Sequence, residues 1–357
     1  MKLTAWTVLR PREPMVLEER EESAGAGEVV VAVAGCGVCH TDLGFHFEGV
    51  PTRHGFPLTL GHEIAGTVVE AGGGAREWLG RTVVVPAVIP CGTCPACREG
   101  RGAVCPAQVF PGSDVHGGFA SHVRVPARGL CPIPELSDPA RNPGGVRLEQ
   151  LAVVADAVST PYQAVIKSGL GPDDLAVFVG AGGIGGFGVQ VAAAFGAAVV
   201  AIDVSGDRLD LAAAHGAALA LRADLLEFKE LRRSVKAFAD QRGIPSWRHR
   251  IFETSGTTAG QATAFGLLGP GGRLGIVGYT PAKVELRLSN LMALDAVAEG
   301  TWGCLPEHYP AVVDLVLAGR IALAPYVETR PLASINEVFA DLHARRASKR
   351  IVLVPES

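Results

Sequence analysis

Four cysteines lie close together in the chain and have the spacing of metal ligands. Cys91, Cys94, Cys97 and Cys105 follow the pattern C-x-x-C-x-x-C-x7-C. Thiolates two residues apart can fold around one ion, and zinc accepts four such ligands in a tetrahedron. Because four thiolates leave no coordination position open, the spacing predicts a structural zinc ion. A pair of disulfides is the alternative, whereas a nucleic-acid zinc ribbon would need a longer gap between its cysteine pairs.

A second set of metal-binding side chains comes from two separate segments. Cys39 lies in GVCHTD and His62 lies in GHE. One thiolate and one imidazole are two of the three protein ligands of a catalytic zinc site, whose fourth position stays open to water or substrate. Asp42 and Glu63 are close in sequence and are expected to orient these ligands. For either ligand alone a buried structural role is the better interpretation, but the pair predicts a metal site.

Three glycines form a third motif that can do chemistry. Gly180, Gly182 and Gly185 form G-x-G-x-x-G directly after an expected strand and at the start of an expected helix. Such glycines permit a tight turn, close approach of a pyrophosphate and helix packing, and the helix N-terminus supplies N–H groups. Asp203 ends the next expected strand, where a carboxylate accepts from ribose hydroxyls and repels a 2′-phosphate. The motif predicts an NAD site, although Arg208 could weaken the preference over NADP or bond the ribose; a packing turn capped by Asp203 is the alternative.

The elements that must position these residues change character near residue 155. Before it, short β-prone runs alternate with Gly, Pro and Cys, which indicates an irregular, mostly antiparallel β domain. After it, six strand-like runs alternate with helical runs, which predicts a doubly wound parallel sheet. The tail ends in RIVLV and is expected to rejoin the first domain. The expected domains are 1–154 with a zinc lobe at about 90–106, then 155–303, then 304–357.

Composition excludes several classes of protein. The chain has 357 residues, of which 48% are apolar and 19% charged, so it is neither a disordered chain nor a fibre. A formal charge of −4 without a long basic run disfavours a nucleic-acid partner. The uncharged stretch from Leu175 to Ile202 is long enough to span a membrane, but its seven glycines and its division into strand, turn, helix and strand favour a buried β-α-β unit. The N-terminus lacks the pattern of a secretion signal, so a cytoplasmic location is expected.

Taken in this order, the motifs resemble those of the zinc-dependent medium-chain dehydrogenase/reductase family, which includes the zinc alcohol dehydrogenases. The resemblance covers essentially the whole chain and implies a GroES-like catalytic domain and a Rossmann domain. It implies that Cys39 and His62 bind the catalytic zinc. The family's third ligand, usually Cys, corresponds to Asp156 in ADAVSTPYQA. Carboxylate oxygen is an acceptable zinc ligand, but a role for Asp156 as a hydrogen-bond acceptor, with water or Glu63 completing the coordination, stays open.

The resemblance also implies roles for other residues. Thr41 would bond the substrate oxygen and accept its proton, and Glu63 would be the acid near the zinc. Several alcohol dehydrogenases have a proton-relay His where this chain has Gly44. His46 could substitute, or protons could leave through water and His46 could be an ordinary surface residue. Besides the glycine motif, Asp203 and Arg208, the implied cofactor-binding residues are His40, Thr160, Gly183, Ile184 and Arg350.

The implied reaction is oxidation of a secondary alcohol to a ketone with NAD, in a chain that holds two zinc ions. Three stretches, VADAVSTPYQA, VVPAVIPCGTCPACREGRGAVCPAQ and GGFASHVRVP, resemble the 6-hydroxycyclohex-1-ene-1-carbonyl-CoA dehydrogenases of anaerobic benzoyl-CoA degradation. Arg53, Arg345 and Arg346 are candidates to contact CoA phosphates, but a solvated surface role is the better interpretation. The alternatives are a general secondary-alcohol or polyol dehydrogenase and a zinc hydratase or lyase. Family habit suggests a homodimer or homotetramer.

Overall fold

The computed structural model describes residues 1–356, which divide into two compact units. The first unit consists of Met1–Ser159, Gly303–Gly319 and the segment from Leu323 onward, and the second consists of Thr160–Trp302 and Arg320–Ala322. The chain therefore enters the second unit after Ser159, a few residues beyond the expected boundary. It returns to the first unit at Gly303.

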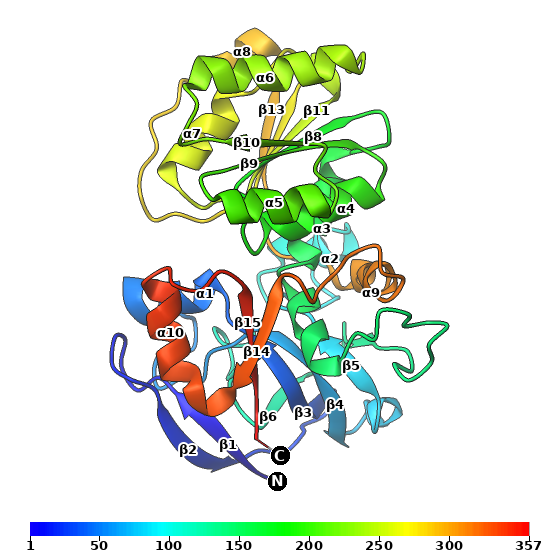
Figure 1. Ribbon diagram of the computed structural model, residues 1–357. Helices are drawn as coiled ribbons and strands as arrows, with labels where there is room; N and C mark the ends of the chain where they lie inside the picture. Colours follow the sequence, from blue (N-terminus) through cyan, green and yellow to red (C-terminus); the bar gives the residue numbers. More distant parts are fainter. Residues whose placement is uncertain (357) are drawn as a thin grey trace. The chain divides into compact units, whose positions relative to one another are not determined.

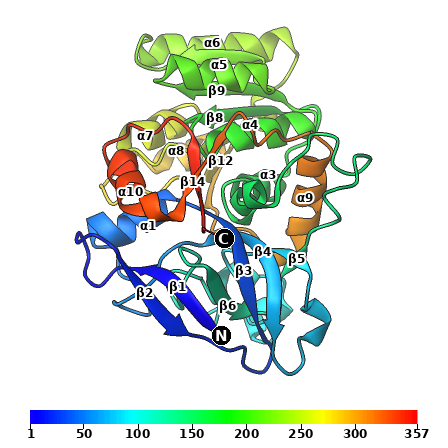
Figure 2. The same cartoon turned by 60° about the horizontal axis from the view of Figure 1, so that its bottom comes forward.

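The main sheet of the first unit is built from both ends of the chain. Its strands follow the order β14-β15-β3-β4-β5-β7, with β6 also paired to β3. The C-terminal strand β15 (Arg350–Val354) pairs antiparallel with β3 (Glu28–Gly37). On its other side β3 pairs with β4, and Figure 2 shows β3 and β4 side by side. The remaining strands are β4 (Glu63–Ala71), β5 (Thr82–Val85), β6 (His122–Pro126), β7 (Cys131–Pro132) and β14 (Val327–Pro331).

A separate two-stranded ribbon and short helices complete the first unit. In the ribbon, β1 (Lys2–Thr7) pairs antiparallel with β2 (Val16–Glu21), and the sequence of β2, VLEERE, is mostly exposed. The apolar side chains of the main sheet pack with Phe119 and Phe339 into one buried core, which gives the metal-binding loops a rigid base. The helices are α1 (His40–Leu43), α2 (Pro95–Arg98), α9 (Tyr309–Leu317) and α10 (Ile335–His343).

The second unit is a doubly wound parallel sheet, as predicted from the alternating pattern. All neighbouring strands are parallel and follow the order β10-β9-β8-β11-β12-β13. Every residue of the central strand β8 is buried, as expected where helices cover both faces. Figure 1 shows α4 and α5 over one face and α6 over the other. The strands are β8 (Leu175–Val179), β9 (Ala198–Asp203), β10 (Leu219–Arg222), β11 (His249–Glu253), β12 (Arg273–Ile276) and β13 (Val297–Gly300).

Local sequence explains where the helices of this unit begin. The Ser205 side chain accepts a hydrogen bond from the backbone N–H of Arg208, and the Thr257 side chain accepts one from Gly260, so both helices have N-caps. The uncharged stretch from residue 175 is divided into β8, α4 and β9, and no helix within residues 1–356 has the length and apolarity to cross a membrane. The helices are α3 (Ser159–Ser168), α4 (Gly185–Ala194), α5 (Gly206–Ala214), α6 (Phe228–Gln241), α7 (Thr258–Gly266) and α8 (Ser289–Leu294).

Candidate metal centres and dinucleotide site

The four clustered cysteines converge in the loop that carries α2. Their sulfur atoms are 3.9 Å apart for Cys91–Cys97, 3.5 Å for Cys94–Cys97 and 3.7 Å for Cys94–Cys105. These separations are close to the edge of about 3.7 Å that a tetrahedron has when zinc–sulfur bonds are about 2.3 Å long. No disulfide forms among residues 1–356, because all eight cysteines are free. The donor set therefore fits one zinc ion with no open coordination position.

Backbone N–H groups direct these sulfur atoms inward. The Cys91 sulfur accepts N–H bonds from Thr93 and Cys94, and the Cys94 sulfur accepts one from Cys97. The hydrogen bonds from Thr93 and Cys94 lower the pKa of Cys91 to about 5. A thiol that is already a thiolate at neutral pH binds zinc without first losing a proton. Burial raises the pKa of Cys97 to about 12, so that thiol must lose its proton when the ion binds.

A second donor cluster lies in the first unit, and its members come from three segments. Potential ligand atoms of Cys39, His62, Glu63 and Asp156 all lie within 4.8 Å of one another. The Asp156 carboxylate is 3.5 Å from the Cys39 sulfur and 3.7 Å from His62 Nε2. These distances again match the edges of a tetrahedron of donors at about 2.0–2.3 Å from a zinc ion. One sulfur, one nitrogen and one oxygen fit a zinc ion with a fourth position open.

Asp42 holds two of these donors in place. Its carboxylate accepts the backbone N–H of Cys39 at 2.9 Å and that of Gly61 at 3.1 Å, and it lies 3.4 Å from His62 Nδ1. Burial lowers the pKa of His62, but Asp42 and Asp156 outweigh this effect and raise it well above its usual value. The buried imidazole therefore lies in a strongly negative environment, which is the electrostatic condition that a divalent cation satisfies.

Glu63 is paired with a buried arginine. Arg350 on β15 donates from Nε to Glu63 Oε2 at 3.0 Å and from Nη2 to Oε1, and Oε1 also accepts the backbone N–H of Ala157 at 3.0 Å. The guanidinium lies 3.9 Å from the Asp156 carboxylate. Glu63 therefore has partners for both oxygens, whereas an Asp156 oxygen faces Cys39 and His62. This geometry favours Asp156 over Glu63 as the third ligand.

The candidate proton-transfer residues lie on α1 and on the helical turn that follows it. The Thr41 hydroxyl is 3.7 Å from the Cys39 sulfur, and His40 is exposed at the start of α1. His46 is only 3% exposed and packs against Phe47 and Phe339, so its interpretation as an ordinary surface residue is wrong. Its Nδ1 atom is buried without a hydrogen-bond partner. Its role as a proton relay stays a prediction.

The glycine motif forms the turn between β8 and α4 in the second unit. Gly180 has φ of 99°, which only glycine adopts without strain. A Cβ at Gly185 would lie 1.7 Å from the Gly180 carbonyl oxygen, so the turn itself requires this glycine. A Cβ at Gly182 would meet only the Arg208 guanidinium, at 3.6 Å. The protein's own packing therefore leaves room at Gly182, and this room fits a pyrophosphate.

The other predicted cofactor residues lie in several different parts of the structure. Asp203 is 7% exposed, and its carboxylate accepts the N–H of Ala181 at 2.7 Å and that of Ser205 at 2.9 Å. Arg208 lies 3.9 Å from the same carboxylate. The Asp203 carboxylate therefore binds backbone N–H groups at the end of β9, and the remaining lone pairs on its oxygens can accept hydrogen bonds from ribose hydroxyls. Of the remaining residues, Gly183 is exposed, Ile184 precedes α4, Thr160 is buried in α3, and Arg350 belongs to the first unit, where it binds Glu63.

One residue near the metal cluster gave no signal in the sequence. Tyr309, at the start of α9, is fully buried. Its hydroxyl donates to the carbonyl of Ala155, the residue before Asp156, and accepts the N–H of Ala87 at 3.3 Å. Because Tyr309 is 154 residues from Ala155 in the chain, no local motif could have linked them.

Comparison with known proteins gives two family matches that together cover more than half of the chain. Residues 25–135 match the alcohol dehydrogenase GroES-like domain, and residues 183–318 match the zinc-binding dehydrogenase domain. An alcohol dehydrogenase of Geobacillus stearothermophilus is 32% identical over 92% of this chain and 91% of its own. The D-arabinose 1-dehydrogenase (NADP(+)) of Saccharolobus solfataricus is 28% identical, over 96% of this chain and 95% of its own.

A solved structure agrees with these sequence matches. The cobalt- and zinc-bound thermostable alcohol dehydrogenase of Pyrobaculum aerophilum is 25% identical and has a TM-score of 0.83. The similarity covers 99% of this chain and 100% of that structure. The fold of both units is therefore shared with a metal-binding alcohol dehydrogenase along the whole chain.

Proposed function

The chain belongs to the zinc-dependent medium-chain alcohol dehydrogenase family and is an oxidoreductase, and from this premise we propose that it oxidises a secondary alcohol to a ketone with NAD. The observation that carries the proposal is the convergence of Cys39, His62 and Asp156, whose donor atoms lie within 4.8 Å of one another. We assign substrate binding and the catalytic metal to the first unit and NAD binding to the second. A zinc ion held by the three donors would supply a Lewis acid for the alcohol oxygen, and NAD would accept the hydride.

Residues of the first unit would bind the metal, orient its ligands and transfer the proton. Cys39, His62 and Asp156 hold the metal, and Asp42 orients the first two. Arg350 forms a buried ion pair with Glu63 and balances its charge, and the same guanidinium lies close to Asp156. The Thr41 hydroxyl, close to Cys39, would accept the proton of the substrate hydroxyl and pass on its own. The four cysteines from Cys91 to Cys105 would hold the second, structural zinc ion.

The cofactor is proposed to be NAD because of the position of Asp203. A buried carboxylate at the end of β9 would accept from the ribose hydroxyls and repel a 2′-phosphate. Arg208 acts against this preference, because a guanidinium close to the same carboxylate can attract a phosphate. The ratio of kcat/KM for NAD and NADP measures the balance, and we expect NAD to be favoured.

The substrate class is argued from the family and from the three sequence stretches. Secondary alcohols and polyols fit the donor set, and the alcohol of 6-hydroxycyclohex-1-ene-1-carbonyl-CoA is the narrower candidate. Neither Arg53 nor Arg346 supports CoA binding, since Arg53 pairs with Asp114 at 2.8 Å and Arg346 with Asp341 at 2.8 Å. Incubation of the zinc-loaded protein with NAD and a panel of alcohols, including cyclohex-2-enol and its acyl-CoA form, tests the proposal. Growth of NADH absorbance with an alcohol supports the proposal. Hydration of the corresponding enone, when it is added instead, without any NADH formation from the alcohols would contradict it.

We also propose that the protein is a homodimer joined through its second unit. Within residues 1–356, β13 is an edge strand of the parallel sheet, and its outer side can accept a further strand. Apolar side chains in the segments just before and after β13 in the sequence are exposed, with Met292 78% exposed, Leu288 67% and Trp302 54%. Such a surface is typical of an interface.

A further inference from the structure

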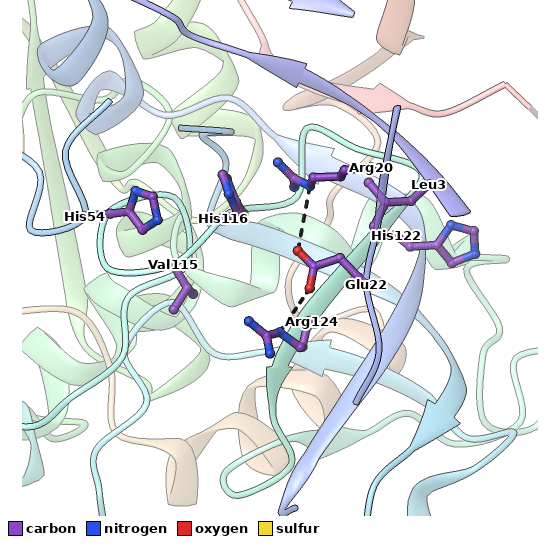
Figure 3. Close-up of a pocket in the computed structure, with 8 residues that line it drawn as sticks. All are labelled: Leu3, Arg20, Glu22, His54, Val115, His116, His122 and Arg124. Carbon is purple, nitrogen blue, oxygen red and sulfur yellow. Dashed lines mark ion pairs between the residues drawn. The ribbon is translucent and has the colours of Figure 1, made fainter. Parts of the chain in front are cut away.

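A cavity of about 130 Å³ in the first unit gathers cationic and imidazole side chains, and it shares no residue with either metal cluster. Arg20 comes from β2, Arg124 comes from β6, and His54 and His116 come from the segments between strands. Glu22 is the one acidic residue among those that line the cavity. Figure 3 shows its carboxylate between the two guanidinium groups, with the His116 ring beside Arg20.

The Arg20 guanidinium is mostly buried and uses few of its hydrogen-bond donors. Its side chain is 20% exposed. Nη1 donates to the Thr59 hydroxyl at 3.0 Å, whereas Nε is buried without a hydrogen bond, 3.7 Å from Glu22. Burial lowers the pKa of Arg20 despite the opposing effect of Glu22. The protein therefore compensates this charge only in part, and a guanidinium with spare N–H groups is a strong site for an oxyanion.

The tautomer of His116 follows from one hydrogen bond. Its Nδ1 atom accepts the backbone N–H of Thr59 at 3.2 Å, so the proton of the neutral ring lies on Nε2. Burial, followed by the charges of Arg20, His54 and Arg124, lowers the pKa of His116 to about 4. At neutral pH the ring is therefore uncharged and has one N–H donor, mainly because it is buried and secondly because positive charges lie near it.

Among the residues that line the cavity, two are arginines and one is an acid. Glu22 lies 3.1 Å from Arg124 Nε and 3.7 Å from Arg20 Nε, so one carboxylate serves two guanidinium groups. A second acid, Glu28, lies 3.4 Å from Arg124 but does not line the cavity. A cation is a poor occupant, because two guanidinium groups line the cavity.

We propose that this cavity binds a tetrahedral oxyanion of the phosphate type through the free N–H groups of Arg20 and Arg124 and the Nε2–H of His116. The planar guanidinium fork matches two oxygens of such an anion. Arg20 and His116 also hold the hydroxyl and the N–H of Thr59, which lies three residues before His62. The site therefore borders the segment that carries a metal ligand.

Calorimetric titration of inorganic phosphate into the full-length, zinc-loaded protein tests the proposal, at an ionic strength held constant with NaCl. Arg20→Gln and Arg124→Gln each remove one guanidinium of the cavity. Arg141→Gln removes the same charge from a side chain that is 67% exposed and does not line it. We expect wild type and Arg141→Gln to bind alike, and the two cavity variants to bind about tenfold or more weakly, as the loss of charged hydrogen bonds implies. Glycerol 3-phosphate, titrated in parallel, distinguishes a phosphate monoester from free phosphate by which of the two binds more tightly.

Two results would overturn the proposal. One is the absence of saturable phosphate binding by the wild-type protein. The other is equal binding by wild type and Arg20→Gln, which would assign the phosphate to the glycine-rich turn or to a metal ion. If circular dichroism shows that Arg20→Gln does not fold, Arg124→Gln decides, because the Arg124 side chain is 44% exposed and its removal leaves the core intact.

Discussion

At the scale of single residues, the candidate metal cluster brings together a sulfur, a nitrogen and an oxygen donor from distant parts of the chain. Cys39 and Asp156 are 117 residues apart, yet their donor atoms are separated by 3.5 Å. If Asp156 takes the place of the family's usual third Cys ligand, the formal charge is kept, because one thiolate and one carboxylate balance Zn²⁺. The harder oxygen donor would then change the ligand chemistry without changing the number of open positions.

Cys39→Ser and Asp156→Asn test the two ligands directly. Each variant should lower turnover by more than about 100-fold, because removing a metal ligand should reduce activity more than removing a group that only orients a ligand. NAD affinity should be unchanged, since the glycine motif lies in the other unit. Steady-state kinetics and fluorescence titration with NADH measure the two quantities.

Matched controls show whether the chemical change alone is responsible. Cys131→Ser alters a buried cysteine outside both clusters, and Asp173→Asn alters a carboxylate whose side chain is 73% exposed. Full turnover in either ligand variant would remove that residue from the metal site.

We expect Tyr309 to position the proposed third ligand, Asp156, through its hydrogen bond to Ala155. Tyr309→Phe removes the hydroxyl that holds the Ala155 carbonyl and the Ala87 N–H, both of which are buried. We expect the free energy of unfolding to fall by about 1–3 kcal/mol, the range for leaving buried polar groups unpaired. We also expect weaker zinc retention, because Asp156 directly follows Ala155. Urea denaturation and competition with a chelator measure these effects.

Tyr279→Phe is the control, because the Tyr279 side chain is 65% exposed. If Tyr309→Phe retained both the stability and the zinc of this control, the hydroxyl would have no positioning role.

Much of the candidate site could be predicted from the sequence, because its donors lie in short motifs. Residues that meet only through the fold could not. The sequence places Arg350 in a C-terminal strand but does not show that β15 pairs with β3, which brings its guanidinium to Glu63. The environment of His46 was still harder to predict, because its burial against Phe339 depends on a helix almost 300 residues away in the chain.

At the scale of elements, the turn between β8 and α4 contains glycines that are needed for two different reasons. At Gly185 the reason is internal, because a Cβ would collide with the Gly180 carbonyl. At Gly182 the neighbouring atoms of the protein would tolerate a Cβ. A glycine at this position is therefore explained by a ligand, and close approach of a bound pyrophosphate fits.

Substitutions of these two glycines should therefore have different effects on NAD binding and on stability. Gly182→Ala should weaken NAD binding by about tenfold or more while leaving the unfolding midpoint unchanged. Gly185→Ala should lower stability by about 1–3 kcal/mol, as overpacking does, and weaken NAD binding as well. NADH titration and thermal unfolding of both variants measure the contrast. An unaltered NAD affinity in Gly182→Ala would contradict the assignment of this turn to the cofactor.

The parallel sheet was easier to predict than the N-terminal ribbon. β8 is a fully apolar run bounded by turn residues, and such runs alternate regularly with helical patterns through the second unit. β2 carries three glutamates and an arginine and is mostly exposed, so its sequence has no hydrophobic alternation to detect. It is a strand because β1 pairs with it residue by residue.

At the scale of the whole molecule, the chain leaves the first unit and returns to it, and the second unit has an exposed edge. Residues beyond Gly303 supply β14 and β15 to the N-terminal sheet, so the first unit is complete only when the whole chain has been made. β13 has no strand on its outer side within residues 1–356. These features predict late folding of the first unit and association through the second.

The proposed dimer can be disrupted at its exposed apolar surface. Met292→Glu places a charge on a side chain that is 78% exposed, in the segment just before β13 in the sequence, and burying that charge in an interface would be unfavourable. Light scattering should show a dimer for wild type and a monomer for the variant. Leu225→Glu alters an equally apolar side chain, 70% exposed, in the connection between β10 and α6. It should remain dimeric, and a monomeric wild type would refute the interface.

The central claim is that Cys39, His62 and Asp156 hold a metal ion separate from the four-cysteine zinc. Anomalous X-ray scattering at the zinc edge, on crystals of the zinc-loaded protein, tests it most directly. The predicted result is two peaks per chain, one among the four cysteines and one bonded to the Cys39 sulfur, His62 Nε2 and an Asp156 oxygen. A single peak at the cysteines, or a second peak that Asp156 does not touch, would contradict the account.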